Sequence, residues 1–179
     1  MEEMIKDYCK KLKIGRTFYR DYKDIEAVSN EEFLLKLLEI ELTQREITRK
    51  KRLLKSAGFD VLKTFQDYSF EYIEIPKSIS LETLKTASLI QNKENLILYG
   101  TVGTGKTHLA TAIGIEACNQ GKNVKFFRTA ALVNQLSEAK ASGNLSKYMR
   151  QIQKCDLLIC DEWGYVPFEK GAVPRCSSK

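Results

Sequence analysis

A run of eight residues in the second half of the chain has the residue types and spacing of a phosphate-binding loop. The run is Gly100-Thr101-Val102-Gly103-Thr104-Gly105-Lys106-Thr107, which fits G-x-x-x-x-G-K-[ST]. Its glycines let the backbone turn N–H groups toward an anion, and a helix that follows aims its N-terminus at the same phosphates. The Lys106 ammonium can reach the β- and γ-phosphates, and the Thr107 hydroxyl can ligate Mg²⁺. The alternative is a chance glycine-rich turn, which the flanking apolar strand and amphipathic helix disfavour.

His108 follows this loop directly, on the first turn of the expected helix. We include it with residues 100–107 as a nucleotide-binding candidate. A lone histidine at such a position is more often packed or hydrogen-bonded than catalytic.

A second candidate element is an apolar run that ends in two carboxylates. It reads Leu157-Leu158-Ile159-Cys160-Asp161-Glu162. After a phosphate loop, this pattern predicts that Asp161 holds Mg²⁺ through water and that Glu162 polarises the attacking water. The catalytic candidates are therefore Lys106 and Glu162, and the metal candidates are Thr107 and Asp161. The alternative is a solvated strand end, because apolar strands often end in acidic turn residues.

A basic cluster lies in a charged helical stretch of the first third. Arg49, Lys50, Lys51 and Arg52 are consecutive, and they could bind DNA phosphates. The alternative is a solvated helix face, to which we give equal weight. The whole chain carries 29 basic and 23 acidic residues, a net charge of +6, which permits a nucleic-acid partner without requiring one.

The elements that position these residues follow from hydrophobic periodicity. Helices are expected from Met4 to Leu12, after a capping-box signature at Ser29 and Glu32 until a stop at Gly58, and after Ser80. Further on, short apolar runs predict strands at 96–99, 124–127 and 157–160, with helices at 108–118, 130–140 and 145–153. This alternation predicts an α/β fold with a parallel sheet flanked by helices. We expect a helical N-terminal domain at 1–60, a connecting segment at 61–92 and a phosphate-loop domain at 93–179.

Composition excludes several classes of protein. Of the 179 residues, 43% are hydrophobic and 29% charged, which argues against wholesale disorder. No apolar run approaches the roughly 18 residues that cross a bilayer, and no signal peptide is recognised, so we expect a cytoplasmic protein without a membrane partner. One histidine makes a multi-histidine zinc site impossible, and five scattered cysteines are read as free thiols.

Two further runs resemble a known family. Lys106-Thr107-His108-Leu109-Ala110 and Asp161-Glu162-Trp163-Gly164-Tyr165-Val166-Pro167 are similar to runs of the IstB-like family, AAA+ P-loop ATPases that assist the transposases of insertion sequences and are relatives of the DnaC-type helicase loaders. The resemblance covers about residues 32–169. It implies ATP and Mg²⁺ as cofactors, and DNA, a transposase and further copies of the chain as partners. The alternatives are a helicase loader that serves a replicative helicase, and a non-hydrolysing nucleotide- and DNA-binding fragment.

The sequence departs from the family pattern after Phe168. The family places there a strand with a polar sensor residue and an arginine finger, whereas residues 171–179 match neither the family nor any periodic pattern. We therefore interpret the chain as a truncated or frameshifted member whose sheet is incomplete and whose ATP hydrolysis is impaired. The missing strand lies next to the first one in the family, so the run at 96–99 is expected to be poorly paired.

Overall fold

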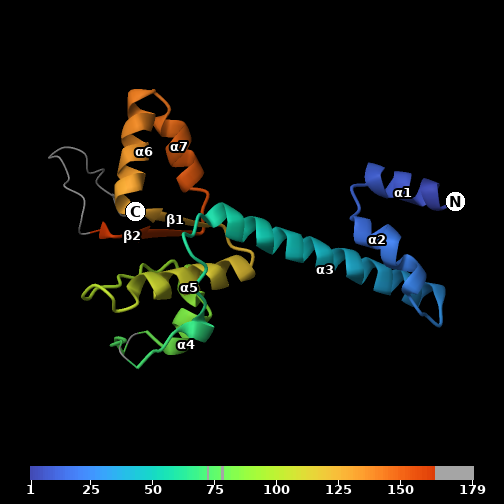
Figure 1. Ribbon diagram of the computed structural model, residues 1–179, viewed down its shortest axis with the longest axis horizontal. Coiled ribbons are helices and arrows are strands. Elements are labelled where there is room, and N and C mark those ends of the chain that lie inside the picture. The colour runs from blue at the N-terminus through green and yellow to red at the C-terminus, as the bar shows by residue number, and fades with distance from the viewer. Residues whose placement is uncertain (72, 78, 164–179) are drawn as a thin grey trace. The chain divides into compact units, whose positions relative to one another are not determined.

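The computed structural model describes residues 1–71, 73–77 and 79–163. The chain divides into two compact units, Met1–Arg52 and Leu53–Lys179, and the division falls within helix α3 (Asn30–Ala57) (Figure 1). The domain boundaries at residues 60 and 92 stay a prediction. No helix in the described ranges is both long and apolar enough to cross a membrane.

The N-terminal unit is helical, as its periodicity predicts. It contains α1 (Glu2–Lys11), α2 (Arg16–Asp21), the 3₁₀ helix η1 (Tyr22–Asp24) and the first part of α3. The capping box forms at the start of α3. The Glu32 N–H donates to Ser29 Oγ at 3.2 Å, and the Glu32 carboxylate accepts from the Val28 N–H at 2.8 Å. The helix ends before Gly58, whose φ of +79° is the left-handed conformation that commonly terminates helices.

The elements of the second unit begin with the 3₁₀ helix η2 (Phe65–Asp67), α4 (Leu81–Lys85) and the 3₁₀ helix η3 (Ser88–Ile90). They continue with α5 (Lys106–Asn119), β1 (Val124–Arg128), α6 (Thr129–Ala141), α7 (Leu145–Ile152) and β2 (Leu157–Asp161). The Ser80 hydroxyl caps α4 by accepting from the Thr83 N–H at 3.0 Å, as predicted. Two of the three predicted strands and all of the predicted helices are therefore present.

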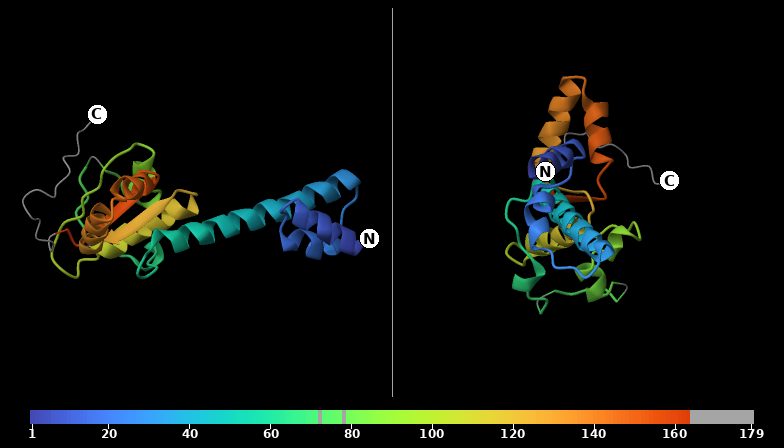
Figure 2. Two further views of the ribbon diagram at one scale, coloured as in Figure 1. Left: turned by 90° about the horizontal axis from the view of Figure 1, so that it is seen from above. Right: turned by 90° about the vertical axis from the view of Figure 1, so that its right-hand side faces the viewer.

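The sheet is parallel, which confirms the predicted α/β class. Strands β1 and β2 pair in a register that sets Val124 opposite Leu157 and Arg128 opposite Asp161. Helix α5 covers one face of the pair, and α6 with α7 lies on the other side (Figure 1, Figure 2). Because the strands are parallel, their carboxyl ends meet at one edge, where Arg128 and Asp161 end the ladder.

The segment 96–99 is not a strand, because it has no ladder partner among the described residues, as the expectation of a poorly paired run implies. Its side chains still alternate as in a strand. Leu96 and Leu98 pack against the core, whereas Ile97 and Tyr99 are 83% and 90% exposed. A strand exists only when a neighbour satisfies its backbone groups, so an apolar sequence alone cannot form one.

The core of the second unit lies beneath α5. Its buried members include Leu109, Ile113, Ala117, Cys118 and Val124, which join α5 to β1. Burial raises the pKa of the Cys118 thiol to about 11, so this cysteine remains protonated at neutral pH. The core thus anchors the helix whose first residue is the lysine of the phosphate loop.

Gly114 allows α5 to lie close to the sheet and to Phe59. A Cβ at this position would stand 2.8 Å from Ile159 Cδ1 and 2.8 Å from Phe59 Cζ. We expect Gly114→Val to lower the free energy of unfolding by about 1–3 kcal/mol, because overpacking forces these neighbours to shift. Urea unfolding followed by circular dichroism measures the change. Ala131→Val, on the exposed face of α6, is the control, and equal stability losses in both variants would contradict this packing role.

Candidate nucleotide-binding site

The predicted phosphate loop is a turn that leads directly into α5. Gly103 and Gly105 have φ angles of +87° and +81°, which side chains with a Cβ rarely adopt. Gly105 is the N-cap of α5, and Lys106 is the first residue of that helix. The N-terminal N–H groups of α5 therefore end at the loop, which is the arrangement that attracts phosphate groups.

The Lys106 side chain folds back over the loop. Its ammonium donates to the carbonyl oxygens of Gly100 at 2.9 Å and Thr101 at 2.6 Å. The Thr104 hydroxyl donates to the same Thr101 carbonyl at 2.9 Å. The ammonium is thus held by oxygen atoms of the loop itself.

The loop and the carboxyl end of β2 meet at Thr107 and Asp161. The Thr107 hydroxyl donates to Asp161 Oδ2 at 2.8 Å, although the two residues are 54 positions apart. A hydroxyl and a carboxylate are hard oxygen ligands of the kind that Mg²⁺ binds together with substrate phosphates. The described residues contain no cluster of three His, Cys, Asp or Glu side chains that could hold a metal ion without such help. This oxygen pair therefore fits a Mg²⁺ ion that accompanies a nucleotide.

The second carboxylate, Glu162, follows at a constrained point of the backbone. Its φ is +60°, which is uncommon for a residue with a side chain, and its side chain is exposed. The preceding carbonyl, that of Asp161, accepts a hydrogen bond of 2.6 Å from the hydroxyl of Thr129, which is only 2% exposed. Sequence reasoning missed Thr129. Thr129 follows the predicted strand at 124–127 closely, and this position could have indicated that its hydroxyl lies at the edge of the sheet where the strands end.

An arginine also stands at this edge of the sheet. Arg128 ends β1, and its guanidinium donates to Asp60 Oδ2 from Nε at 2.9 Å and from Nη2 at 2.8 Å. Asp60 raises the pKa of Arg128, and the charges of Glu162 and Asp161 add to the effect. More than half of each side chain in the ion pair is exposed, so the pair contributes little to stability. The ion pair therefore matters for orientation, because it holds the Arg128 guanidinium against Asp60.

His108 joins α5 to the segment before α4. Its Nε2 lies 2.8 Å from the Thr64 carbonyl oxygen, and its ring lies edge-on to that of Tyr68 with centroids 5.0 Å apart. Tyr68 also borders the loop, since a Cβ on Gly105 would come within 3.0 Å of its ring. Burial raises the pKa of Tyr68. The weak sequence pattern of residues 60–80 did not reveal that this segment lies against the loop.

The predicted DNA-binding residues lie in the N-terminal unit and are all exposed. Arg49 and Arg52 line a hollow together with Lys13 and Arg45, whereas Lys50 and Lys51 do not line it. We call these four lining residues, Lys13, Arg45, Arg49 and Arg52, the basic hollow. Residues 45, 49 and 52 share one face of α3 because they are four and three positions apart.

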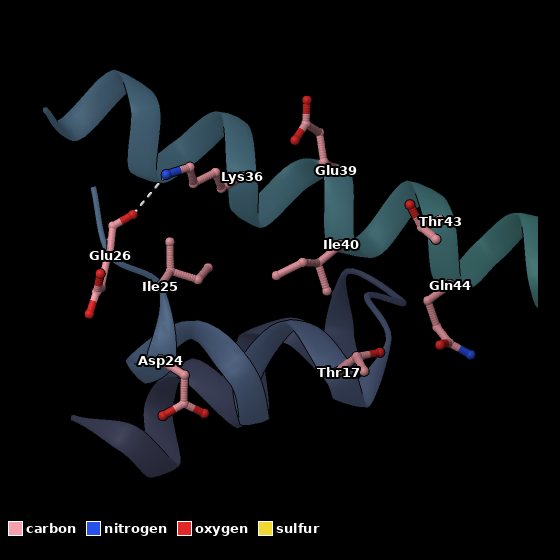
Figure 3. Close-up of a pocket in the computed structure, with 9 residues that line it drawn as sticks. All are labelled: Thr17, Asp24, Ile25, Glu26, Lys36, Glu39, Ile40, Thr43 and Gln44. Atoms are coloured by element: carbon pink, nitrogen blue, oxygen red, sulfur yellow. Dashed lines mark hydrogen bonds between the residues drawn. The ribbon is translucent and has the colours of Figure 1, made fainter. Parts of the chain in front are cut away.

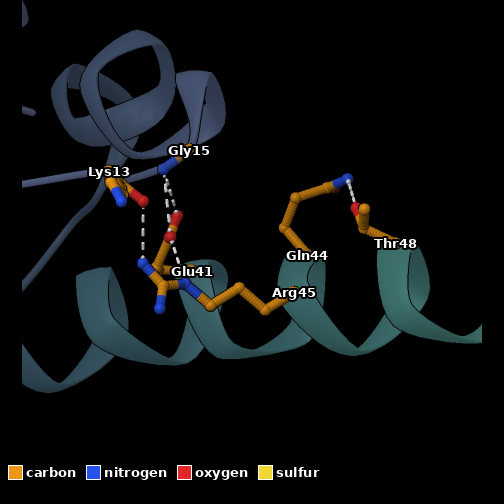
Figure 4. A network of polar contacts seen from close by, with 6 residues as sticks. All are labelled: Lys13, Gly15, Glu41, Gln44, Arg45 and Thr48. Atoms are coloured by element: carbon orange, nitrogen blue, oxygen red, sulfur yellow. Dashed lines mark hydrogen bonds and ion pairs between the residues drawn. The ribbon is translucent and has the colours of Figure 1, made fainter. Parts of the chain in front are cut away.

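A buried carboxylate organises the floor of the basic hollow (Figure 4). Glu41 is 7% exposed, and its two oxygens accept from the Gly15 N–H at 3.0 and 2.9 Å. Arg45 donates to Glu41 from Nε at 2.6 Å and to the Lys13 carbonyl from Nη2 at 3.0 Å. The Glu41 charge is therefore compensated inside the unit, and the hollow presents mainly cationic groups.

Comparison with known proteins shows which family the chain resembles. The profile of the IstB-like ATP binding protein family matches residues 18–174. A protein of Geobacillus stearothermophilus, named as an ATP-binding protein of insertion sequence IS5376, is 34% identical over 97% of this chain and 71% of its own length. Its counterpart in IS1162 of Pseudomonas fluorescens is 33% identical over 82% of this chain and 64% of its own length.

A third relative extends the same pattern. The protein named as the ATP-binding protein of IS21 from Pseudomonas aeruginosa is 32% identical over 78% of this chain and 52% of its own length. The chain thus spans between about half and three quarters of these relatives. The profile covers both the phosphate loop and the carboxylates that end β2. The chain belongs to the IstB-like ATP binding protein family.

Proposed function

We propose that this chain is an ATP-binding helper protein of DNA transposition, which binds ATP with Mg²⁺ at residues 100–108 and 161. The observation that carries the proposal is the 2.8 Å contact between Thr107 and Asp161, because it joins the phosphate loop to a strand-end carboxylate. The names of the relatives, which tie ATP binding to insertion sequences, support a transposase rather than a replicative helicase as the partner.

Each residue of the site has a separate task in this proposal. The loop N–H groups and the N-terminus of α5 bind the phosphates. Lys106 neutralises the β- and γ-phosphate charge, which requires its ammonium to leave the carbonyls of Gly100 and Thr101. Thr107 and Asp161 would hold Mg²⁺, which would supply positive charge that stabilises the phosphates.

The second carboxylate of the site, that of Glu162, would act in ATP hydrolysis. Glu162 orients the attacking water and accepts its proton as the water oxygen bonds to the γ-phosphorus and the bond from that phosphorus to the bridging oxygen of ADP breaks, which gives ADP and phosphate. An arginine at the γ-phosphate contributes about 10³–10⁵ to the rate in related enzymes. Arg128, which ends the neighbouring strand, is instead bound to Asp60. We propose that the chain alone binds ATP but turns it over slowly, and steady-state hydrolysis measured beside nucleotide affinity tests this. Fast turnover by the isolated chain would contradict this proposal and would also exclude the binding-only alternative.

DNA binding is assigned to the basic hollow. Three arginines on one face of α3 with Lys13 beside them form a positive strip that suits a phosphate backbone. No base-reading contact is implied, so the binding would be independent of sequence. Of the four predicted DNA-binding residues, this proposal keeps Arg49 and Arg52 and leaves out Lys50 and Lys51, which do not line the hollow.

The salt dependence of DNA affinity tests whether Arg49 and Arg52 contact DNA and Lys50 and Lys51 do not. We expect Arg49→Gln with Arg52→Gln to weaken duplex binding roughly 10- to 100-fold at 0.1 M salt and to reduce the slope of log affinity against log salt by about 1.8, because two phosphate contacts are lost. Lys50→Gln with Lys51→Gln removes the same charge from the same helix and is the matched control. If both double substitutions weaken DNA binding equally, the affinity depends on net charge and not on the basic hollow. If neither changes the affinity, residues 49–52 are a solvated helix face without a role in DNA binding.

A further inference from the structure

An arginine outside both sequence motifs stands at the edge of the sheet where the proposed nucleotide site lies. Arg128 ends β1, and the parallel register sets it opposite Asp161 of β2. Its guanidinium donates to Asp60, and the two side chains of this ion pair are 59% and 56% exposed. Asp60 is the main cause that raises the pKa of Arg128. The charges of Glu162 and Asp161 add to this effect, so both carboxylates of the site lie within electrostatic reach of the guanidinium.

Arg128 and Asp161 lie on the same face of the sheet, because residues opposite each other in a parallel register point to the same side. Ile159, two positions before Asp161, also lies on this face. A Cβ on Gly114 of α5 would stand 2.8 Å from Ile159 Cδ1, so this is the face that α5 covers. Thr107 of the same helix contacts Asp161 at 2.8 Å. The guanidinium of Arg128 and the start of α5 therefore belong to the same side and the same edge of the sheet.

Asp60 reaches Arg128 because the segment after α3 is anchored to the sheet. Gly58 follows the helix, and the Phe59 ring packs on that of Phe126 with centroids 5.8 Å apart. Asp60 comes next, and its Oδ2 accepts from Nε at 2.9 Å and from Nη2 at 2.8 Å. An exposed ion pair holds its partners only weakly, so a more highly charged anion at the same edge can compete with Asp60 for the guanidinium.

We propose that Arg128 leaves Asp60 when ATP binds and contacts the γ-phosphate, and that Asp60 competes with the nucleotide for it. The inference rests on the proposed function, because it takes the contact between Thr107 and Asp161 to mark the place of the phosphates. A guanidinium binds phosphate through two parallel hydrogen bonds, and a terminal phosphate carries more negative charge than a carboxylate. ADP offers no phosphate at this position. Arg128 therefore makes the site prefer ATP to ADP, and Asp60 limits that preference.

The hollows of the N-terminal unit offer no such discrimination. The hollow beside α2 and η1 is lined by the carboxylates of Asp24, Glu26 and Glu39 (Figure 3), which repel phosphate. The Lys36 side chain also lines it, but its ammonium donates to the Glu26 carbonyl at 2.9 Å. Any ATP bound at the basic hollow would be held by the residues of that hollow. Variants of the ion pair therefore report on the nucleotide site.

The ratio of ATP affinity to ADP affinity tests the contact, and no turnover needs to be measured. In isothermal titrations of the full chain with Mg²⁺, we expect Arg128→Gln to lower this ratio about 3- to 10-fold by weakening ATP alone, because a charge-assisted contact at an exposed site is lost. Asp60→Asn should raise the ratio about 2- to 5-fold, because an amide competes less well for the guanidinium. In the double variant the ratio should equal that of Arg128→Gln, because no arginine is left to compete for.

Two exposed residues provide matched controls. Arg150→Gln on α7 and Asp67→Asn in η2 remove the same charges elsewhere in the same unit and should leave the ratio unchanged. A ratio that Arg128→Gln does not lower, or a gain from Asp60→Asn that persists in the double variant, overturns the proposal. Lys106→Ala separates this failure from that of the proposed function. If Lys106→Ala weakens ATP binding and Arg128→Gln leaves the ratio unchanged, only the Arg128 contact is refuted. An unchanged ATP affinity in Lys106→Ala refutes the nucleotide site, and this inference with it.

Discussion

Replacing Lys106 with alanine lowers the affinity for ATP roughly 10- to 100-fold in our account. The substitution removes a charge-assisted contact to the β- and γ-phosphates, which is worth about 1.5–3 kcal/mol. The fold should survive, because Lys106 lies at the first position of α5 and its ammonium contacts only residues of the loop in the described hydrogen bonds. Isothermal titration of ATP in excess Mg²⁺ measures the loss.

Two controls make the Lys106 result specific. Lys147→Ala removes the same charge from an exposed position on α7 and should leave the affinity unchanged. Lys106→Arg keeps the charge on a larger group, and we expect it to restore only part of the affinity because the loop closes around a compact ammonium. Equal affinities of wild type and Lys106→Ala would place the nucleotide elsewhere.

Replacing Asp161 with asparagine should remove most of the Mg²⁺ dependence of ATP binding. Groups that hold a metal ion through its ligands or bound water typically contribute 10- to 100-fold to metal affinity, so we expect a loss on the order of tenfold. Affinity in EDTA should hardly change, because the loop, Lys106 and the N-terminus of α5 remain. The ratio of affinities with and without Mg²⁺ is therefore the quantity to compare.

Asp161→Asn is nearly isosteric, so the contact with Thr107 can persist through the amide oxygen. Asp67→Asn, at an exposed position in η2, controls for the loss of one negative charge. If Asp161→Asn weakens binding equally with and without Mg²⁺, Asp161 acts on the fold or on the loop and not on the metal ion.

The sequence motifs predicted the backbone of the loop and the neighbouring carboxylate because both are local features of the chain, and their role as a nucleotide site stays a prediction. The loop motif determines its own backbone, and Gly103 and Gly105 adopt the left-handed conformations that the motif requires. The contact of Thr107 with Asp161 places the start of α5 beside the carboxyl end of β2, which is the edge where parallel sheets bind ligands. The assignment of these residues to ATP and Mg²⁺ remains a proposal that the variants above test.

Features that depend on distant partners were harder to predict. Helix α2 has six residues without a strong periodic signal, and it is held by Glu41, which lies 26 positions after Gly15. The contacts of Tyr68 with Gly105 and of Arg128 with Asp60 join segments whose sequence patterns give no hint of each other. At residues 96–99 a strand was predicted that the structure does not contain, because an apolar sequence without a partner does not form a ladder.

In the proposed function, the loop at residues 100–107 binds the phosphates of ATP. Amide chemical-shift changes in an ¹⁵N-labelled chain titrated with ATP and Mg²⁺ test it most directly, because the N–H groups of the loop are the proposed ligands. We predict the largest shifts at Gly103, Gly105, Lys106 and Thr107, with saturation at one ATP per chain. Shifts confined to the basic hollow around Arg45, Arg49 and Arg52 would mean that ATP binds there as a simple anion, and would contradict the account.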